Sequence, residues 1–150
     1  MRMNYDERRQ VMKAIHDQHF THHITVNFTA KRSFDIYAAE KTVHSFIRAL
    51  SKKLFQRAYR RRKQTVQFVS RIERAPTTNR LHAHILIKQP ANKGKFRFQT
   101  ALTSSLLMNP AIPRSHGAVK IQEADRNPDL AEYQVKYDIN EEEQRFIWGA

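Results

Sequence analysis

The sequence contains no cysteine, and only three of its 150 residues are glycine and five are proline. The lack of cysteine excludes disulfides, thiolate zinc sites and a cysteine nucleophile, so any metal ion must be bound by His, Asp or Glu. The scarcity of turn-forming residues, together with the absence of repeats and low-complexity tracts, leaves no mark of an internal boundary. We therefore expect one domain over residues 1–150.

The sequence also lacks a long apolar run, a signal peptide and a lipidation motif. A membrane partner is therefore not expected. Negative charge is scarce as well, because 27 Lys and Arg stand against 14 Asp and Glu, a formal net charge of +13. An excess of this size indicates a polyanionic partner, and nucleic acid is the first candidate.

Apolar and polar residues alternate with the period of a half-buried strand in several segments. The predicted strands cover about 23–29, 66–73 and 81–87, with a shorter one near 118–123. The connection between the second and third of these strands is short, which favours an antiparallel pair. One side of each strand is apolar and the other is polar, so the polar sides together predict an open polar face on the sheet.

Helical spacing of apolar residues is clearest from about Ala38 to Ala58. Residues 5–18 have a narrow apolar stripe, and a further helix is expected over about 98–108. A last helix is predicted from a cap at Asn127 through Tyr137. The sequence therefore predicts the α+β class, with an antiparallel sheet that carries helices on one face and polar side chains on the other.

His82 and His84 lie on the same face of their strand, about 7 Å apart along the backbone. Glu73 has the same facing parity on the partner strand, so it can add a carboxylate oxygen to the same ion. Two imidazoles and a carboxylate suit Mg²⁺ or Mn²⁺, with the nitrogen ligands favouring Mn²⁺, and zinc stays possible. The alternative is that the histidines merely fill the polar side of a strand.

Tyr133, Lys136 and Tyr137 follow the i, i+3, i+4 pattern of one helical face. A tyrosine hydroxyl is a weak nucleophile at neutral pH unless a cation stabilises its phenolate, which Lys136 and a nearby metal ion would do. The alternative is an amphipathic helix with half-buried tyrosines and a lysine that extends to solvent. In combination with the metal site, the cluster favours attack by Tyr133 on a phosphate of DNA.

The chain resembles the HUH endonuclease superfamily, which includes rolling-circle replication initiators, relaxases and related transposases. The segment His22–Thr29 resembles the first strand of the family, Arg80–Ile87 the strand with histidine, a hydrophobic residue and histidine, and Tyr133–Tyr137 the tyrosine motif. The resemblance covers about residues 20–140. It implies a central antiparallel sheet of four or five strands, related in topology to the RNA-recognition motif, with the histidines in mid-sheet.

Carried over residue by residue, the resemblance makes His82 and His84 metal ligands, Glu73 the third ligand, Tyr133 the nucleophile and Lys136 its helper. Some members have a second catalytic tyrosine at the position of Tyr137. Each tyrosine of those members is commonly followed three residues later by lysine, whereas this sequence has Asn140. Tyr133 is therefore favoured as the principal nucleophile.

The resemblance further implies an enzyme that nicks single-stranded DNA, with Mn²⁺ or Mg²⁺ as cofactor, and stays joined to the cut 5′ end through a phosphotyrosine. This activity would initiate rolling-circle replication of a plasmid, phage or virus. The expected location is the cytoplasm, or the host interior with the replicating DNA. A host or element-encoded helicase is an expected partner, because 150 residues are too few to add a helicase domain.

Basic residues are densest in one run and are predicted to contact DNA phosphates. The predicted DNA contacts are Arg57, Arg60, Arg61, Arg62, Lys63 and Arg71. The alternative for such a run is a solvated helix face. His19, His22 and His23 form a further cluster that could bind metal, but we favour a polar segment that leads into a strand.

Other classes of protein share some of these features. A transposase of the same superfamily would use the same site. A non-catalytic nucleic-acid-binding module of similar topology would need exposed aromatic residues on the sheet. A metal-independent RNA endonuclease would not need Glu73, and a two-histidine phosphoesterase would need two His-x-Thr motifs, which the sequence lacks.

Overall fold

The computed structural model of the chain describes residues 4–31, 34–75, 77–123 and 145–149. Four helices and five strands occur within these residues. In chain order they are α1 (Tyr5–Asp17), β1 (His22–Asn27), α2 (Ile36–Phe55), α3 (Arg57–Arg62), β2 (Phe68–Arg74), β3 (Leu81–Ile87), α4 (Lys95–Leu107), β4 (Val119–Glu123) and β5 (Arg145–Gly149). None of the described helices is both long and apolar enough to cross a membrane.

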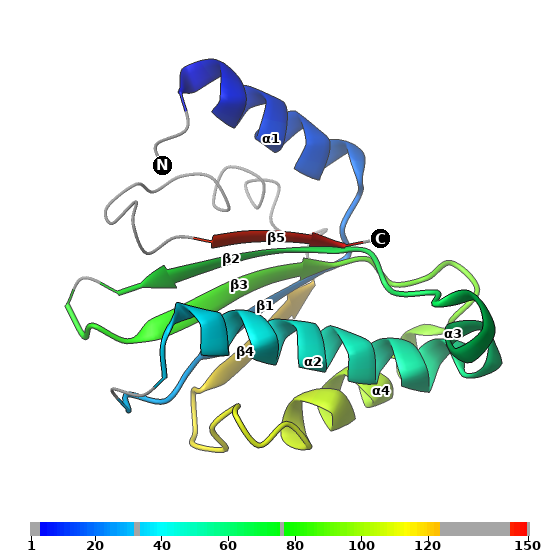
Figure 1. Cartoon of the computed structure of the whole chain (residues 1–150). Coiled ribbons are helices and arrows are strands. Elements are labelled where there is room, and N and C mark those ends of the chain that lie inside the picture. The colour runs from blue at the N-terminus through cyan, green and yellow to red at the C-terminus, as the bar shows by residue number, and fades with distance from the viewer. Residues whose placement is uncertain (1–3, 32–33, 76, 124–144, 150) are drawn as a thin grey trace.

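The described strands form a single antiparallel sheet in the order β4-β1-β3-β2-β5 (Figure 1). From β1 to β4 the chain follows the β-α-β-β-α-β succession of split β-α-β folds. The predicted α+β class, with four or five antiparallel strands and flanking helices, is therefore confirmed. β3 is the central strand, with β1 on one side and β2 on the other.

The predicted hairpin of the second and third strands is confirmed. β2 and β3 pair in one continuous register, in which Glu73 lies opposite His82 and Arg71 opposite His84. The connecting turn is closed by a hydrogen bond from the amide of Ala75 to the carbonyl oxygen of Arg80, at 2.9 Å. This register places residues of equal parity on the same face of the sheet.

One face of the sheet packs against α2 and α4 (Figure 1). The strand residues on this face are apolar, and Ile24, Ile72 and Ile85 are at most 1% exposed. α2 begins at Asp35, whose side chain accepts a hydrogen bond from the amide of Ala38 at 2.8 Å. Most of the hydrophobic core therefore lies between the sheet and these two helices.

The predicted helix over 38–58 is interrupted near its end. α2 stops at Phe55 because Gln56 adopts a φ of 47° and a ψ of −108°, which is not helical. Arg57–Arg62 then forms the separate short helix α3. Neither Gly nor Pro occurs at this break, so the sequence had no local signal for it.

The prediction that helices cover one face only is wrong. α1 lies on the face opposite α2 and α4 (Figure 1). Its Ile15 packs with Val69 of β2 and Leu86 of β3 in a second, smaller apolar cluster, against which Val11 and Met12 also rest. The polar face is therefore partly covered, at the end where β2 begins and β3 ends.

The remaining elements differ from the sequence predictions in extent. α4 begins at Lys95, three residues before the expected start, and the predicted strand near 118–123 is β4. β5 was not predicted. The predicted last helix, from Asn127 through Tyr137, lies outside the described residues.

Candidate metal centre

Polar residues of three adjacent strands lie next to one another on the face opposite α2 and α4. Across β1, β3 and β2, the register aligns Thr25 with His84 and Arg71. One step further along the sheet, it aligns Asn27 with His82 and Glu73. A strand alternation that is visible in sequence thus becomes a two-dimensional array of polar side chains.

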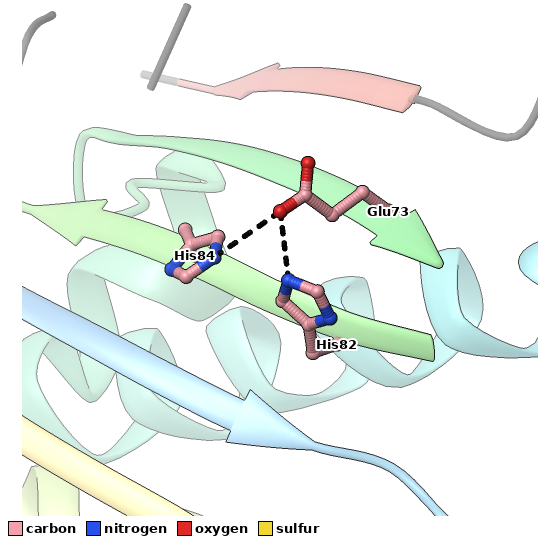
Figure 2. Close-up of side chains that lie close together, drawn as sticks. All are labelled: Glu73, His82 and His84. Atoms are coloured by element: carbon pink, nitrogen blue, oxygen red, sulfur yellow. Dashed lines mark hydrogen bonds and ion pairs between the residues drawn. The ribbon is translucent and has the colours of Figure 1, made fainter. Parts of the chain in front are cut away.

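Glu73, His82 and His84 converge on one point of this array (Figure 2). The Nε2 atom of His82 is 2.7 Å from Oε1 of Glu73, and the Nε2 atom of His84 is 3.6 Å from the same oxygen. The two imidazole rings are nearly perpendicular, with centroids 4.9 Å apart. One ligand atom from each residue lies within 4.8 Å of the other two.

This geometry fits a divalent metal ion. Ligand atoms at about 2.1 Å from Mg²⁺ in adjacent octahedral positions lie about 3 Å from each other, a separation between the two measured distances. The donor set of two imidazole nitrogens and one carboxylate oxygen suits Mn²⁺ and related ions. Three protein ligands would also leave coordination positions open for other groups.

Burial and hydrogen bonding hold these ligands in the ionisation state that binds metal. Burial acts to raise the pKa of Glu73, but the hydrogen bonds from His82 and His84 and the charge of Arg71 outweigh it, so this pKa lies below its ordinary value. Burial is also the main cause that lowers the pKa of His84. At neutral pH the carboxylate is therefore ionised and the His84 imidazole is neutral.

Arg71 is buried in the array although its charge predicted a DNA contact. Its side chain is 1% exposed, and its Nη1 atom is 2.9 Å from Oε2 of Glu73. On the other side of the sheet centre, the Thr25 hydroxyl lies 3.5 Å from Nδ1 of His84. Both groups touch the proposed ligands on the side away from the point where the three ligand atoms meet.

His23 belongs to the same face and was not recognised from the sequence as part of it. Its ring lies 5.6 Å from the ring of His84, centroid to centroid. Burial first, and then the neighbouring His84, lower the pKa of His23 to about 4. His22 faces the other side, with its ring 4.8 Å from Phe98. The adjacent histidines of β1 therefore do not share one site, although the parity rule for strands could have separated them.

The basic run lies away from the metal centre. α3 precedes β2, whereas Glu73 is near the other end of that strand, about 17 Å further along it (Figure 1). Its arginines and Lys63 are exposed, and the ammonium groups of Lys52 and Lys63 each lie 5.7 Å from the ring of Tyr59. The predicted role of Arg57, Arg60, Arg61, Arg62 and Lys63 in DNA contact stays a prediction.

The predicted catalytic residues Tyr133, Lys136 and Tyr137 lie outside the described residues. They fall in sequence between β4 and β5, which are the two edge strands of the sheet. The ends of this segment are therefore fixed at the two edges of the sheet that carries the metal centre.

Comparison with known proteins gives one family. The family of the replication-associated protein ORF2 matches residues 21–142 of the chain. The match includes the metal centre, the basic run and the tyrosine motif, and it begins after α1. A search of curated proteins gave no match. The family match and the Glu73, His82 and His84 cluster together confirm the resemblance to rolling-circle replication proteins of the HUH superfamily.

Proposed function

The chain belongs to the replication-associated protein ORF2 family, and from this premise we propose that it is a metal-dependent nickase of single-stranded DNA. In this role it would initiate rolling-circle replication. The observation that carries the proposal is the convergence of Glu73, His82 and His84 within 4.8 Å on a sheet face. A binding module without catalysis would not need these three ligands in one place.

Glu73, His82 and His84 would hold the ion, Mn²⁺ or Mg²⁺. Bound there, it would polarise a non-bridging oxygen of the scissile phosphate and stabilise the charge that develops during attack. The protein supplies a rigid platform for this chemistry, since both histidines belong to the central strand. The ionised carboxylate and the neutral His84 imidazole bind a cation without first losing a proton.

Tyr133 is the proposed nucleophile. Its phenolic oxygen would form a bond to phosphorus while the bond from phosphorus to the 3′ oxygen breaks in line. The phenol loses its proton and the departing 3′ oxygen gains one, so the step is balanced. Lys136 would stabilise the phenolate. The product is a 5′ phosphotyrosine and a free 3′ hydroxyl, which can later reverse the reaction without ATP.

Tyr137 is the alternative nucleophile, one helical turn from Tyr133 in the predicted last helix. Lys136 follows Tyr133 by three residues, whereas Asn140 follows Tyr137 by the same spacing. This difference in the nearby charge favours Tyr133.

The substrate would be single-stranded DNA at an origin or hairpin. The net charge of +13 and the exposed basic residues of α3 support a DNA partner. Because α3 lies about 17 Å along β2 from Glu73, its arginines would contact DNA several nucleotides away from the cut. A helicase from the host or the element would separate the strands. The replication-associated family favours replication over the transposase alternative.

A covalent-adduct assay tests the proposal. Oligonucleotides that contain the candidate origin are labelled at the 3′ end in one set and the 5′ end in another, then incubated with the protein and Mn²⁺ or with chelator. Denaturing gels should show a 3′-labelled protein adduct and a shortened free 5′-labelled fragment, both only with Mn²⁺. Attachment of the opposite label would contradict the stated chemistry.

Matched variants locate the nucleophile and the metal centre. Tyr133→Phe should abolish the adduct, whereas Tyr37→Phe, at an exposed tyrosine of α2, should not. His82→Ala should abolish it, and His116→Ala, at an exposed histidine, should not. Loss in Tyr137→Phe but not in Tyr133→Phe would move the nucleophile by one turn. Tight, metal-independent binding with no adduct on any substrate would favour the non-catalytic module.

A further inference from the structure

Arg71 is a charged side chain buried as deeply as the apolar core. It is 1% exposed and is among the largest of the fully buried side chains. Removing a charge from water costs several kcal/mol unless partners in the protein replace the water. A guanidinium in this position therefore requires a specific interaction that outweighs the cost of burial.

Glu73 provides that interaction, and its two oxygens have different neighbours. Oε2 lies 2.9 Å from Nη1 of Arg71. Oε1 lies 2.7 Å from Nε2 of His82 and 3.6 Å from Nε2 of His84. The carboxylate is thus oriented by Arg71 on one side, with its other oxygen toward the two imidazoles (Figure 2).

The register explains how this orientation arises. Arg71 and Glu73 are two residues apart on β2, so both side chains point to the same face. Their strand partners are His84 and His82. The arginine therefore approaches Glu73 from the sheet interior, while the histidines reach it from the neighbouring strand.

We infer that Arg71 is a positioning residue of the metal centre, which holds Glu73 as a one-oxygen ligand, and that it does not bind DNA phosphate directly. This inference rests on the proposed metal site and assigns Arg71 a different role from the basic residues of α3. Without the guanidinium, Glu73 would rotate among several orientations, and binding an ion would require selecting one of them. Groups that orient metal ligands commonly contribute on the order of 10- to 100-fold to metal affinity.

Direct Mn²⁺ binding, measured by calorimetry without DNA, tests the inference. Arg71→Met keeps much of the side-chain length but removes the charge and the donors. We expect it to weaken Mn²⁺ binding by about 10- to 100-fold. Arg71→Lys should recover part of the loss, because an ammonium group can still donate one hydrogen bond to Oε2. The matched control is Arg60→Met on α3, which should bind Mn²⁺ like the unmodified protein and bind DNA less tightly.

A double-variant cycle separates positioning from a general loss of structure. In a Glu73→Gln background, Arg71→Met should cause no further loss of Mn²⁺ affinity, because the group that it orients is already altered. In nicking assays, excess Mn²⁺ should restore Arg71→Met activity to near the unmodified level. If Arg71→Met does not fold, judged by circular dichroism, the cycle is run with Arg71→Lys.

Two results would overturn the inference. One is unchanged Mn²⁺ affinity in Arg71→Met together with weaker DNA binding in chelator, which would make Arg71 a phosphate contact. The other is an equal loss of Mn²⁺ affinity in the presence and absence of the Glu73 carboxylate. Failure of the unmodified protein to bind Mn²⁺ would instead overturn the metal centre on which the proposed function depends. Mn²⁺ binding without any DNA adduct would overturn the nickase while leaving the role of Arg71 intact.

Discussion

The two faces of the sheet are equally buried at their centres but differ completely in chemistry. On the face toward α2 and α4, Ile72 and Ile85 are at most 1% exposed. On the opposite face, the alternate residues Arg71 and His84 are 1% and 4% exposed. The same two strands therefore supply a hydrocarbon core on one side and an array of ionisable groups on the other.

This difference separates the source of stability from the source of function. Burying an isoleucine side chain contributes about 1.5–3 kcal/mol to folding. Burying a charged group costs free energy, which partners only partly offset. A protein selected for stability alone would gain by replacing the polar array with apolar residues, so its retention supports a role in binding or catalysis. Substitutions on each face should test this separation, and their expected effects decrease in the order given below.

The largest effect is expected for His82→Ala on the polar face. Loss of a metal ligand should lower the nicking rate by at least about 100-fold, since even groups that only orient ligands contribute up to about that factor. The free energy of unfolding in chelator should change less than in Ile85→Ala, because His82 is partly exposed. Single-turnover cleavage and urea denaturation would measure the two effects. Retained activity would remove His82 from the site.

Ile85→Ala should have the opposite profile. Ile85 is 1% exposed on the helix-covered face, next in sequence to His84. Loss of buried methyl groups and the resulting cavity should lower the free energy of unfolding by about 2–5 kcal/mol. At a temperature where the variant is folded, its Mn²⁺ affinity should stay close to normal. A loss of Mn²⁺ affinity as large as in His82→Ala would show that the two faces are not separable.

Ile15→Ala tests the apolar corner of the polar face. Ile15 packs with Val69 and Leu86, but its other neighbours in this cluster are only partly buried. The loss in unfolding free energy should therefore be near the lower limit, about 2 kcal/mol, and smaller than in Ile85→Ala. Leu107→Ala, at a residue 56% exposed on α4, is the control and should change stability little. A larger loss than in Ile85→Ala would make α1 part of the main core.

The smallest effect concerns pH and His23. Its folded pKa of about 4 lies below the ordinary value of 6.5, so between these two pH values the unfolded chain binds more protons. The contribution of His23 to stability is complete above pH 6.5 and is lost as the pH falls toward 4. The slope from this residue is at most about 1.4 kcal/mol per pH unit. In chelator, His23→Gln should reduce the pH dependence of unfolding, and an unchanged slope would refute this assignment.

The β2–β3 hairpin could be predicted from sequence because two independent patterns agree. Apolar and polar residues alternate in both strands, and the connection between them is short. The placement of Glu73 opposite His82 follows from that hairpin, so the metal cluster was already implied by residue parity. Strand geometry needs no knowledge of the rest of the fold, which explains why this part of the prediction was correct.

The location of α1 and the role of Arg71 depend on tertiary contacts that sequence does not specify. The apolar stripe of α1 shows which side of the helix is buried, but not which sheet face it covers. The charge of Arg71 predicts an anionic partner equally well whether that partner is DNA or Glu73. β5 was missed because its five residues are too few for a clear alternation, and its pairing with β2 is long-range.

The central place of β3 has a consequence for hydrogen exchange. Its residues from His82 to Ile87 are paired with β1 on one side and with β2 on the other. Opening this strand requires the loss of both neighbours, so its amides should exchange with solvent only when the whole sheet opens. Fluctuations at the edges would then leave the spacing of His82 and His84 intact. The protein could therefore release and regain its ion many times without rebuilding the part of the scaffold that sets the distance between these two ligands.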